Sequence, residues 1–176
     1  MTQVEKHPRW QVRMEASYAR WQEGGELHGR DYDGFLEGLG ELDAMCVALG
    51  NLNYQVENGG FMQWHDNGYS SAAGLLAEAL GSVGTLAATQ VSTLVEEANE
   101  TIASFEELKD EYGRAARYSH GHRLADFEAD FSDMVQEKLC DELEPLNSRY
   151  YDVSGQLMDD IEAWLVRTES QEGGEG

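Results

Sequence analysis

The sequence predicts an all-α fold, a compact single-domain bundle of about six or seven helices with little or no β structure. Apolar residues recur at steps of three and four along most of the chain, and only two prolines interrupt it. The hydrophobic fraction of 41% supplies enough apolar surface for a core. For 176 residues we expect one helical domain over residues 1–168 and a disordered acidic tail over residues 169–176.

The N-terminal part of the chain predicts two amphipathic helices. The first spans about residues 8–22, with Pro8 in its first turn and an apolar face made of Trp10, Met14, Tyr18 and Trp21. A Gly-rich loop at residues 24–29 leads to a second helix over about residues 33–52. The apolar face of this helix consists of Phe35, Leu39, Leu42, Cys46 and Leu49.

Residues 53–69 allow two interpretations. Asn58-Gly59 could form a type I′ hairpin turn, because both residues tolerate a positive φ. Alternatively, Asn58, Gly59 and Gly60 end one helix and begin the next, with glycine at the C-cap. The helical patterns on both sides favour the second interpretation, and Asn67-Gly68 then marks a further turn.

The middle of the chain predicts a short helix followed by a long one. The short helix is rich in Ala and Leu, covers residues 70–80 and ends near Gly81. The long helix covers about residues 85–105, and Ser104 with Glu107 matches a capping box at which a helix could begin again. Its inward residues are expected to be Leu86, Val91, Leu94, Val95, Ala98 and Ile102.

Two further helices are predicted near the C-terminus. Residues 113–121 connect to them, as a loop or as a short helix. The first helix covers residues 122–143, and Pro145 ends it and suits the first turn of the last helix, which runs to about Arg167. The inward face of the first helix is expected to contain Leu124, Phe127, Phe131, Met134, Val135 and Leu139.

Composition argues against a membrane or secreted protein. The N-terminus has no apolar signal-peptide region, and no apolar run approaches the ~20 residues that span a bilayer. Cys46 and Cys140 lack CxxC or disulfide-framework spacing, and both lie in apolar helical patterns. We therefore expect two buried free thiols and a soluble, cytoplasmic protein.

The charge of the chain is strongly negative and unevenly distributed. There are 34 acidic against 12 basic residues, a formal net charge of −22, and residues 96–176 hold 22 of the acids and seven of the bases. A surface of this sign repels nucleic acid and anionic membranes and attracts proteins that carry basic surfaces. We therefore expect neither direct nucleic acid binding nor membrane binding.

A row of acidic residues follows one face of the predicted 122–143 helix and its end. The steps of three and four place the row within an arc of roughly 80°, and its members are Asp126, Asp130, Asp133, Glu137, Asp141 and Glu144. One interpretation is a solvated face that keeps the protein soluble. The absence of Lys or Arg within the arc favours a partner-binding surface, because like-charge pairs at this spacing each cost about 0.2–0.5 kcal/mol. Glu100, Glu107 and Glu111 are the next candidate contacts.

Histidines are the only other candidates for chemistry. His65-Asp66 and His120-Gly121-His122 resemble metal ligands, but zinc and iron sites need three or four ligands in fixed geometry. HExxH, GxSxG, P-loop and GxGxxG motifs are absent from the sequence. We expect no catalytic residues, no metal and no cofactor, and a metalloenzyme built from the three histidines remains the less favoured alternative.

Residues 54–64, YQVENGGFMQW, followed by Asn67 and Gly68, resemble the signature of the bacterial DNA-mimic-protein domain family. In that signature, variants of E-x-x-N-G-G-F-x-Q precede an N-x-x-G turn. The resemblance covers about residues 35–165. It implies an all-helical fold and, for acidic members, binding to a DNA-binding protein in place of DNA.

The motif itself is interpreted as structural. Two adjacent glycines let the chain turn and bring helices together, and the flanking polar side chains can satisfy backbone groups at helix ends. The residues assigned to this role are Glu57, Asn58, Gly59, Gly60, Phe61 and Gln63.

Charge and resemblance together predict a DNA mimic that blocks the basic DNA-binding groove of a partner protein. The partner could be a transcription regulator, a nucleoid protein, or a nuclease of a restriction or CRISPR defence system, and the sequence does not choose among them. An acidic interaction domain unrelated to DNA-binding partners is the alternative. Homodimerisation also stays open: it would lengthen the acidic surface, but the charge on each chain opposes it.

Overall fold

The computed structural model describes the backbone of residues 7–23, 32–119 and 124–172, and the side chains of residues 7–20, 32–111 and 133–171. Within these ranges every regular element is helical, which confirms the all-α prediction. The elements are α1 (Arg9–Glu23), α2 (Tyr32–Glu37), α3 (Glu41–Asp66), the 3₁₀ helix η1 (Tyr69–Ala72), α4 (Ala73–Val83), α5 (Leu86–Ser119) and α6 (Leu124–Glu172).

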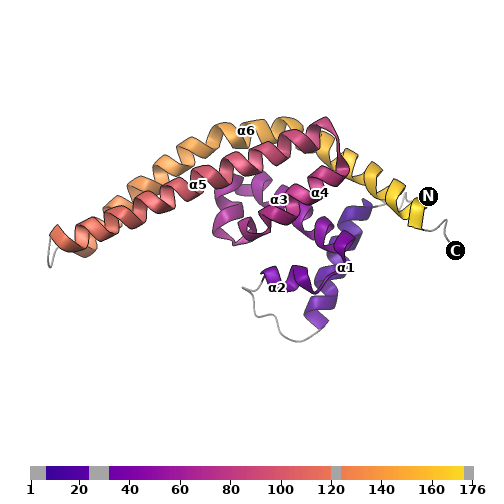
Figure 1. Ribbon diagram of the computed structural model, residues 1–176, viewed down its shortest axis with the longest axis horizontal. Helices are drawn as coiled ribbons and strands as arrows, with labels where there is room; N and C mark the ends of the chain where they lie inside the picture. The colour runs from indigo at the N-terminus through magenta and orange to yellow at the C-terminus, as the bar shows by residue number, and fades with distance from the viewer. Residues whose placement is uncertain (1–6, 24–31, 120–123, 173–176) are drawn as a thin grey trace, which may run out of the picture.

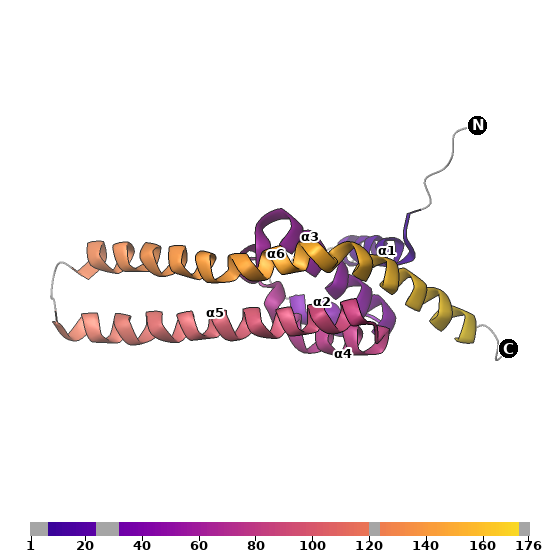
Figure 2. The same ribbon diagram turned by 90° about the horizontal axis from the view of Figure 1, so that it is seen from above.

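The two longest helices form an antiparallel pair that the other helices flank on one side. α5 and α6 run side by side and make the most extensive helix contact of the described chain (Figure 2). α3 and α4 pack against this pair, and α1 packs against α3 and the C-terminal part of α6 (Figure 1). The far ends of α5 and α6 extend well beyond the other helices. We call the compact remainder of the molecule the body.

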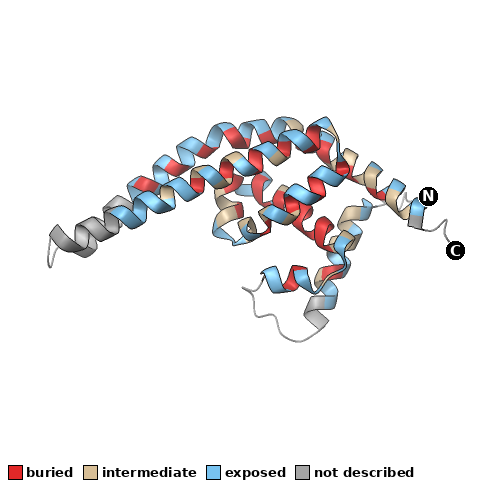
Figure 3. Cartoon of the chain, viewed as in Figure 1, coloured by how far each residue is buried: buried red, intermediate tan, exposed pale blue. Residues whose placement is uncertain are grey.

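The hydrophobic core lies in the body, where α3, α4, α5 and the second half of α6 meet. Phe61, Trp64 and Tyr150 are its largest fully buried side chains, and the Phe61 ring makes edge-on contacts with both of the others. Among the described side chains where α5 and α6 begin to project, only Ile102, Val135, Leu139 and Leu143 are buried (Figure 3). The body therefore holds the fold together, and most of the described side chains at residues 103–111 and 133–142 of the projecting pair are exposed.

The Gly-rich segment of α3 is a break between two helical segments. Gly59 and Gly60 have non-helical backbone angles, and Gly60 has φ 72° with ψ −175°, a conformation that is accessible essentially to glycine alone. The helix-break interpretation of this segment is therefore the correct one, and the hairpin is not formed. The turn expected at Asn67-Gly68 is present, with Gly68 at φ 80°.

α5 is much longer than the sequence indicates. Thr85 caps its start by accepting a hydrogen bond from the Ala88 backbone N–H on its hydroxyl. Ser104 does not restart the helix, because its hydroxyl donates to the Glu100 carbonyl four residues earlier, as a serine inside a helix does. The helix continues to Ser119, so the connection expected over residues 113–121 is wrong for its first part.

α6 likewise continues through the proline that was expected to end it. Pro145 lies inside the helix and is exposed. Proline removes one N–H and leaves the Asp141 carbonyl without its helical partner. Water can reach that carbonyl because this side of the helix faces solvent. The prediction of two separate helices here is wrong, and α6 curves gently in both views (Figures 1 and 2).

α1 packs on α3 through apolar contacts and ion pairs. A Cβ on Gly50 would lie 2.4 Å from the Met14 sulfur, so this glycine lets the two helices approach closely. Arg13 pairs with Asp43 at 2.7 Å and with Glu169 at 2.9 Å. Arg9 pairs with Glu162 and Glu169, and Arg20 pairs with Asp43 at 2.6 Å. We call this network of three arginines and three carboxylates the arginine clamp.

The clamp lies at the C-terminal end of α6. That helix reaches Glu172, so residues 169–172 of the stretch for which disorder was expected are helical. Residues 173–176 lie outside the described part of the chain. None of the helices within the described ranges has an apolar run long enough to cross a bilayer.

Four expectations about single side chains have mixed outcomes. Cys46 is a buried free thiol, and burial raises its pKa to about 12. Cys140 is free but exposed, so its predicted burial is wrong. Leu86 and Met134 were expected to face inward, but 76% and 50% of their surfaces are exposed. Leu86 begins α5, and Met134 lies where α6 has only α5 beside it.

Candidate functional site

The projecting ends of α5 and α6 carry all nine acidic residues predicted to bind a partner. We call residues 100–119 of α5 and 124–144 of α6 the acidic arm. In both views the arm extends past the body, so neither helix is covered there by any other described element (Figure 2). The arm therefore presents long helical faces to anything that approaches.

On α6 the acidic row lies opposite the buried face. Val135, Leu139 and Leu143 are buried towards α5 and the body. Asp133, Glu137, Asp141 and Glu144 are all exposed. At about 100° per residue, the row is centred roughly 160° from the buried face. Asp126 and Asp130 lie on α6 at positions that continue the same row, but their side chains are outside the described ones.

α5 carries a second row with the same relation to its own buried face. Val95, Ala98 and Ile102 are buried. The predicted contacts Glu100, Glu107 and Glu111 are exposed on the opposite side of the helix, and so is Glu96. The structure therefore places two acidic rows on the exposed sides of two antiparallel helices, away from the buried face of each.

The exposed carboxylates of the two rows have no ion-pair partner among the described residues. Among the described residues, the ion pair nearest the arm joins Glu97 of α5 to Arg149 of α6, at 2.6 Å. Lys109 and Lys138 are exposed on the arm but pair with none of these acids. The described carboxylates of the rows thus carry charge that no described basic side chain neutralises, and a basic partner surface could neutralise it.

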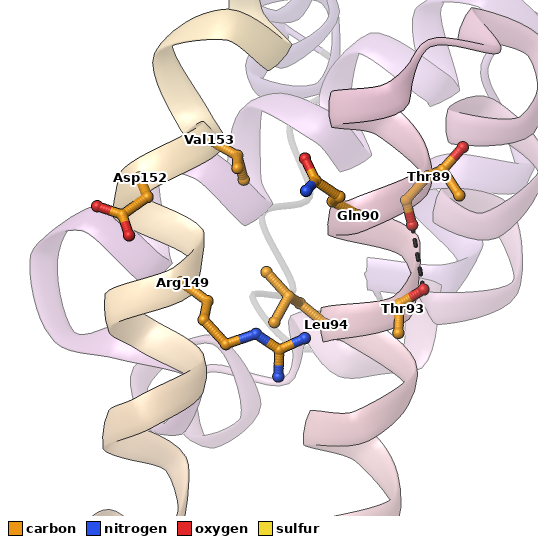
Figure 4. Close-up of a pocket in the computed structure, with 7 residues that line it drawn as sticks. All are labelled: Thr89, Gln90, Thr93, Leu94, Arg149, Asp152 and Val153. Carbon is orange, nitrogen blue, oxygen red and sulfur yellow. Dashed lines mark hydrogen bonds between the residues drawn. The ribbon is translucent and has the colours of Figure 1, made fainter.

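The outer face between α5 and α6 is hollowed beside this ion pair. A depression of about 360 Å³ is lined by Thr89, Gln90, Thr93 and Leu94 from α5 and by Arg149, Asp152 and Val153 from α6. In Figure 4, Arg149 reaches towards α5, whereas Asp152 points away from it. The Thr93 hydroxyl donates to the Thr89 carbonyl at 3.2 Å. Hydrogen-bonding groups therefore lie beside the ion pair of Glu97 with Arg149.

A second depression continues along the same seam towards the arm. It also measures about 360 Å³, and its lining includes Glu100 and Ser104 from α5 and Glu142 and Leu146 from α6. At both depressions and at the ion pair of Glu97 with Arg149, residue numbers rise along α5 as those of the facing residues fall along α6, as expected for antiparallel helices. The acidic rows therefore border a shallow seam that contains both polar and apolar groups.

The dimensions of the rows suit a charged, extended partner surface. The α6 row from Asp126 to Glu144 spans about 27 Å at 1.5 Å per residue. Its carboxylates follow one another every ~5–6 Å, whereas phosphates on one DNA strand advance ~3.4 Å along the axis. The arm can thus present a DNA-like potential to a basic groove, but it does not copy the positions of the phosphates.

The NGGF segment lies in the body and anchors α6 there. The Phe61 backbone N–H donates to the Asn147 side-chain oxygen at 2.8 Å, so Asn147 acts as an N-cap from a distant helix. A Cβ on Gly60 would lie 2.5 Å from the Asn147 amide nitrogen. No local pattern marks Asn147 as this partner, because 86 residues separate it from Phe61.

Polar contacts surround the same break in α3. Gln55 accepts hydrogen bonds from Gln63 and Asn67, at 2.7 Å and 2.8 Å. Ser154 of α6 donates to Glu57 at 3.2 Å. Asn58 donates to the Tyr54 carbonyl. These side chains are therefore used in contacts within the fold, and the contact of Ser154 with Glu57 joins α6 to α3.

The histidines do not form a metal centre in the described part of the chain. His65 lies 3.1 Å from the Ser70 hydroxyl through its Nδ1 atom. Within the described residues, no three or more His, Cys, Asp or Glu side chains are grouped so as to hold a metal ion. His120 and His122 lie outside the described residues.

Comparison with known proteins gives one match. No curated protein and no solved structure matches the chain. A family model described as DMP19-like protein matches residues 37–168, which include α3, η1, α4, α5 and nearly all of α6. This confirms the resemblance based on the NGGF segment. The match covers well over half of the chain, which therefore belongs to the DMP19-like protein family, a family of DNA-mimic proteins.

Proposed function

We propose that this protein is a DNA mimic whose acidic arm occupies the basic DNA-binding groove of a partner protein and blocks its access to DNA. The observation that carries the proposal is the pair of exposed acidic rows on α5 and α6, whose carboxylates have no ion-pair partner among the described residues. Family membership supplies the class of function. The contact residues are Asp126, Asp130, Asp133, Glu137, Asp141 and Glu144 on α6 and Glu100, Glu107 and Glu111 on α5.

The electrostatics of the arm support this role over a solvated surface. Solubility requires net charge but not unbroken rows of like charge, which destabilise each helix by about 0.2–0.5 kcal/mol per neighbouring pair. A basic groove that meets the rows would relieve this repulsion and release counterions from both surfaces. Association would therefore be fast and would weaken as salt rises.

The partner belongs to the class of DNA-binding proteins with a basic groove. A transcription regulator or a nucleoid protein would make the arm a host regulator, and a restriction or CRISPR nuclease would make it an inhibitor of defence. We place this activity in the cytoplasm, where such partners meet DNA. The protein would act by binding alone, with no catalytic step.

Affinity capture with competition by DNA tests the proposal. The tagged protein is incubated with bacterial lysate at low and high salt, with and without excess duplex DNA. We expect a specific partner that both salt and DNA release. A matched bait carries Asp133→Lys, Glu137→Lys and Asp141→Lys, and it should capture much less of that partner. A partner that DNA does not displace would contradict mimicry and favour an acidic interaction domain of another kind.

A further inference from the structure

A groove distinct from the acidic arm lies in the body, between α2, the start of α3 and the η1–α4 segment. Its volume is about 500 Å³, within the usual range for ligand sites. The apolar residues that line it are Leu36, Leu39, Ala44, Ala72 and Leu75. Leu36, Ala44 and Ala72 are buried, whereas Leu39 and Leu75 are partly exposed. We call this feature the α2–α4 groove.

Three carboxylates also line the α2–α4 groove, and no basic residue does. Asp33, Glu37 and Glu41 are exposed, and none of them has an ion-pair partner among the described residues. Asp33 and Glu37 lie four residues apart on α2, where like charges repel each other. The groove therefore combines an apolar lining with uncompensated negative charge.

We propose that the α2–α4 groove binds a short segment of a protein partner in which leucine-like residues alternate with arginine or lysine. The hydrocarbon stems of such side chains would pack against Leu39 and Leu75. Their cationic ends would meet Asp33, Glu37 and Glu41. The same carboxylates repel nucleic acid and anionic lipid headgroups, and an uncharged apolar ligand would leave them unpaired.

This proposal does not rest on the acidic arm or on DNA mimicry. The arm offers exposed charge on helical faces, so it selects mainly for positive potential. The α2–α4 groove also offers an apolar lining, so it selects for amphipathic segments. A partner that used both would be held at two separate places on the chain.

Two glycines of α4 provide a matched pair of variants. Gly74 lines the groove, and no atom lies within 4 Å of the position of its Cβ. Gly81 lies in the same helix with equally open space, and it does not line the groove. Gly74→Met should fill the groove, whereas Gly81→Met adds the same side chain elsewhere. At both positions the Cβ would meet open space and the residue is exposed, so both variants should fold.

The probe is a fluorescent peptide, acetyl-Leu-Arg-Ala-Leu-Arg-Ala-amide, followed by anisotropy at physiological salt. The host chain carries Asp133→Lys, Glu137→Lys and Asp141→Lys, so that the arm no longer attracts the peptide. We expect Gly74→Met to weaken binding by about tenfold or more, because it removes the apolar contact surface. Gly81→Met should leave the affinity unchanged. Equal affinity in both variants would overturn the proposal.

Variant peptides and the amide chemical shifts of the protein complete the test. Replacing Arg by Gln, or Leu by Ser, in the peptide should each weaken binding to the host chain. Amide chemical shifts should move at Leu36, Ala44 and Leu75. Loss of binding with the Gln peptide alone, with shifts confined to α5 and α6, would overturn the groove proposal. Neither result bears on the arm, because capture of a DNA-displaceable partner by the unmodified chain tests that proposal separately.

Discussion

Polar side chains in the two halves of α6 differ in whether they bond to other helices. Beyond residue 145, several of its polar side chains bond to other helices: Tyr150 to Asn53, Tyr151 to the Val56 carbonyl, and Glu169 to Arg9 and Arg13. Before residue 145, Asp133, Glu137 and Asp141 have no ion-pair partner among the described residues. The same helix is thus a scaffold at one end and an unneutralised charged surface at the other.

The difference shows that the number of acidic residues does not locate a binding surface. Glu162 and Glu169 of α6 and Asp43 of α3 are as acidic as the arm residues, but the arginine clamp neutralises them. α1, which supplies all three arginines, lies outside the segment matched by the family. Ion pairing therefore neutralises acids at the C-terminal end of α6 but none of the described acids of the arm rows, and changes in either half of α6 should have separable effects.

The largest effect on stability is expected at the body end, from Gly60→Ala. The backbone conformation of Gly60 strains any residue with a Cβ, and that atom would collide with the Asn147 side chain. The free energy of unfolding should fall by about 3 kcal/mol or more. Urea denaturation measures it, and Gly81→Ala is the control because its Cβ would meet open space. Equal stability of the two variants would show that Gly60 does not help to anchor α6 to the body.

Reversal of the arm charges should have the second largest effect, on binding alone. Asp133→Lys, Glu137→Lys and Asp141→Lys should weaken partner binding by about 100-fold, since each reversal removes roughly 1 kcal/mol of Coulomb attraction. The midpoint of thermal unfolding should stay the same or rise, because repulsion within the row is relieved. A smaller pair, Asp130→Lys with Glu137→Lys, should weaken binding in the same direction.

The control for this variant reverses three exposed acids elsewhere. Asp66→Lys, Glu78→Lys and Asp159→Lys change the net charge by the same amount at sites away from the arm. If both triple variants weakened binding equally, the net charge of the molecule would explain the interaction and the arm would lose its special role. Calorimetric titration with the captured partner gives both affinities.

Much of the contrast between the two halves of α6 could be predicted from the sequence, because it depends on helical periodicity. The steps between Asp133, Glu137 and Asp141 place them on one face, and the buried Val135 and Leu139 lie opposite, as predicted. Where each helix ends was not accessible. Pro145 is accommodated because it faces solvent, and Ser104 bonds backwards within α5, so local breaking signals were overridden.

The contacts that create the contrast were also hidden from the sequence. Asn147 caps Phe61, and Arg13 joins α1 to α3 and α6, across long sequence separations. Such pairings arise only when the helices pack, and no spacing rule within one helix reports them. The sequence could therefore indicate which face is acidic but not which acids are neutralised.

Loss of the clamp should have an intermediate effect, confined to the body. Arg13→Gln breaks the ion pairs with Asp43 and Glu169 and should lower the free energy of unfolding by about 1–2 kcal/mol. Arg13→Lys keeps the charge but cannot reach two carboxylates with a planar fork, so its loss should be smaller. Partner binding by the arm should not change. If Arg13→Gln were as stable as the unmodified chain, the arginine clamp would contribute nothing measurable to the free energy of unfolding.

Acid should weaken the same contact. The hydrogen bond from Arg13 holds the pKa of Glu169 below its ordinary value, although burial opposes this. Burial also raises the pKa of Asp43, but the hydrogen bonds from Arg20 and Arg13 outweigh it and the net direction is down. Lowered carboxyl pKa values give stability that is present above the unfolded-state values near pH 4 and is lost as pH falls through the folded-state values. The protection factors of α1 amides, measured by hydrogen exchange, should therefore fall below about pH 4, and Arg13→Gln should remove much of this dependence.

The smallest effect is expected at the boundary between the two halves, where Glu97 pairs with Arg149. Both side chains are largely exposed, and ion pairs of this kind contribute about 0–1 kcal/mol. Glu97→Gln should change the free energy of unfolding by less than about 0.5 kcal/mol and should leave partner binding within about twofold. A loss of affinity as large as that of the arm variant would contradict the proposed limit of the binding surface at residue 100 of α5. It would place an ion-paired residue among the contacts, and the binding surface would then extend from the arm onto the depression shown in Figure 4.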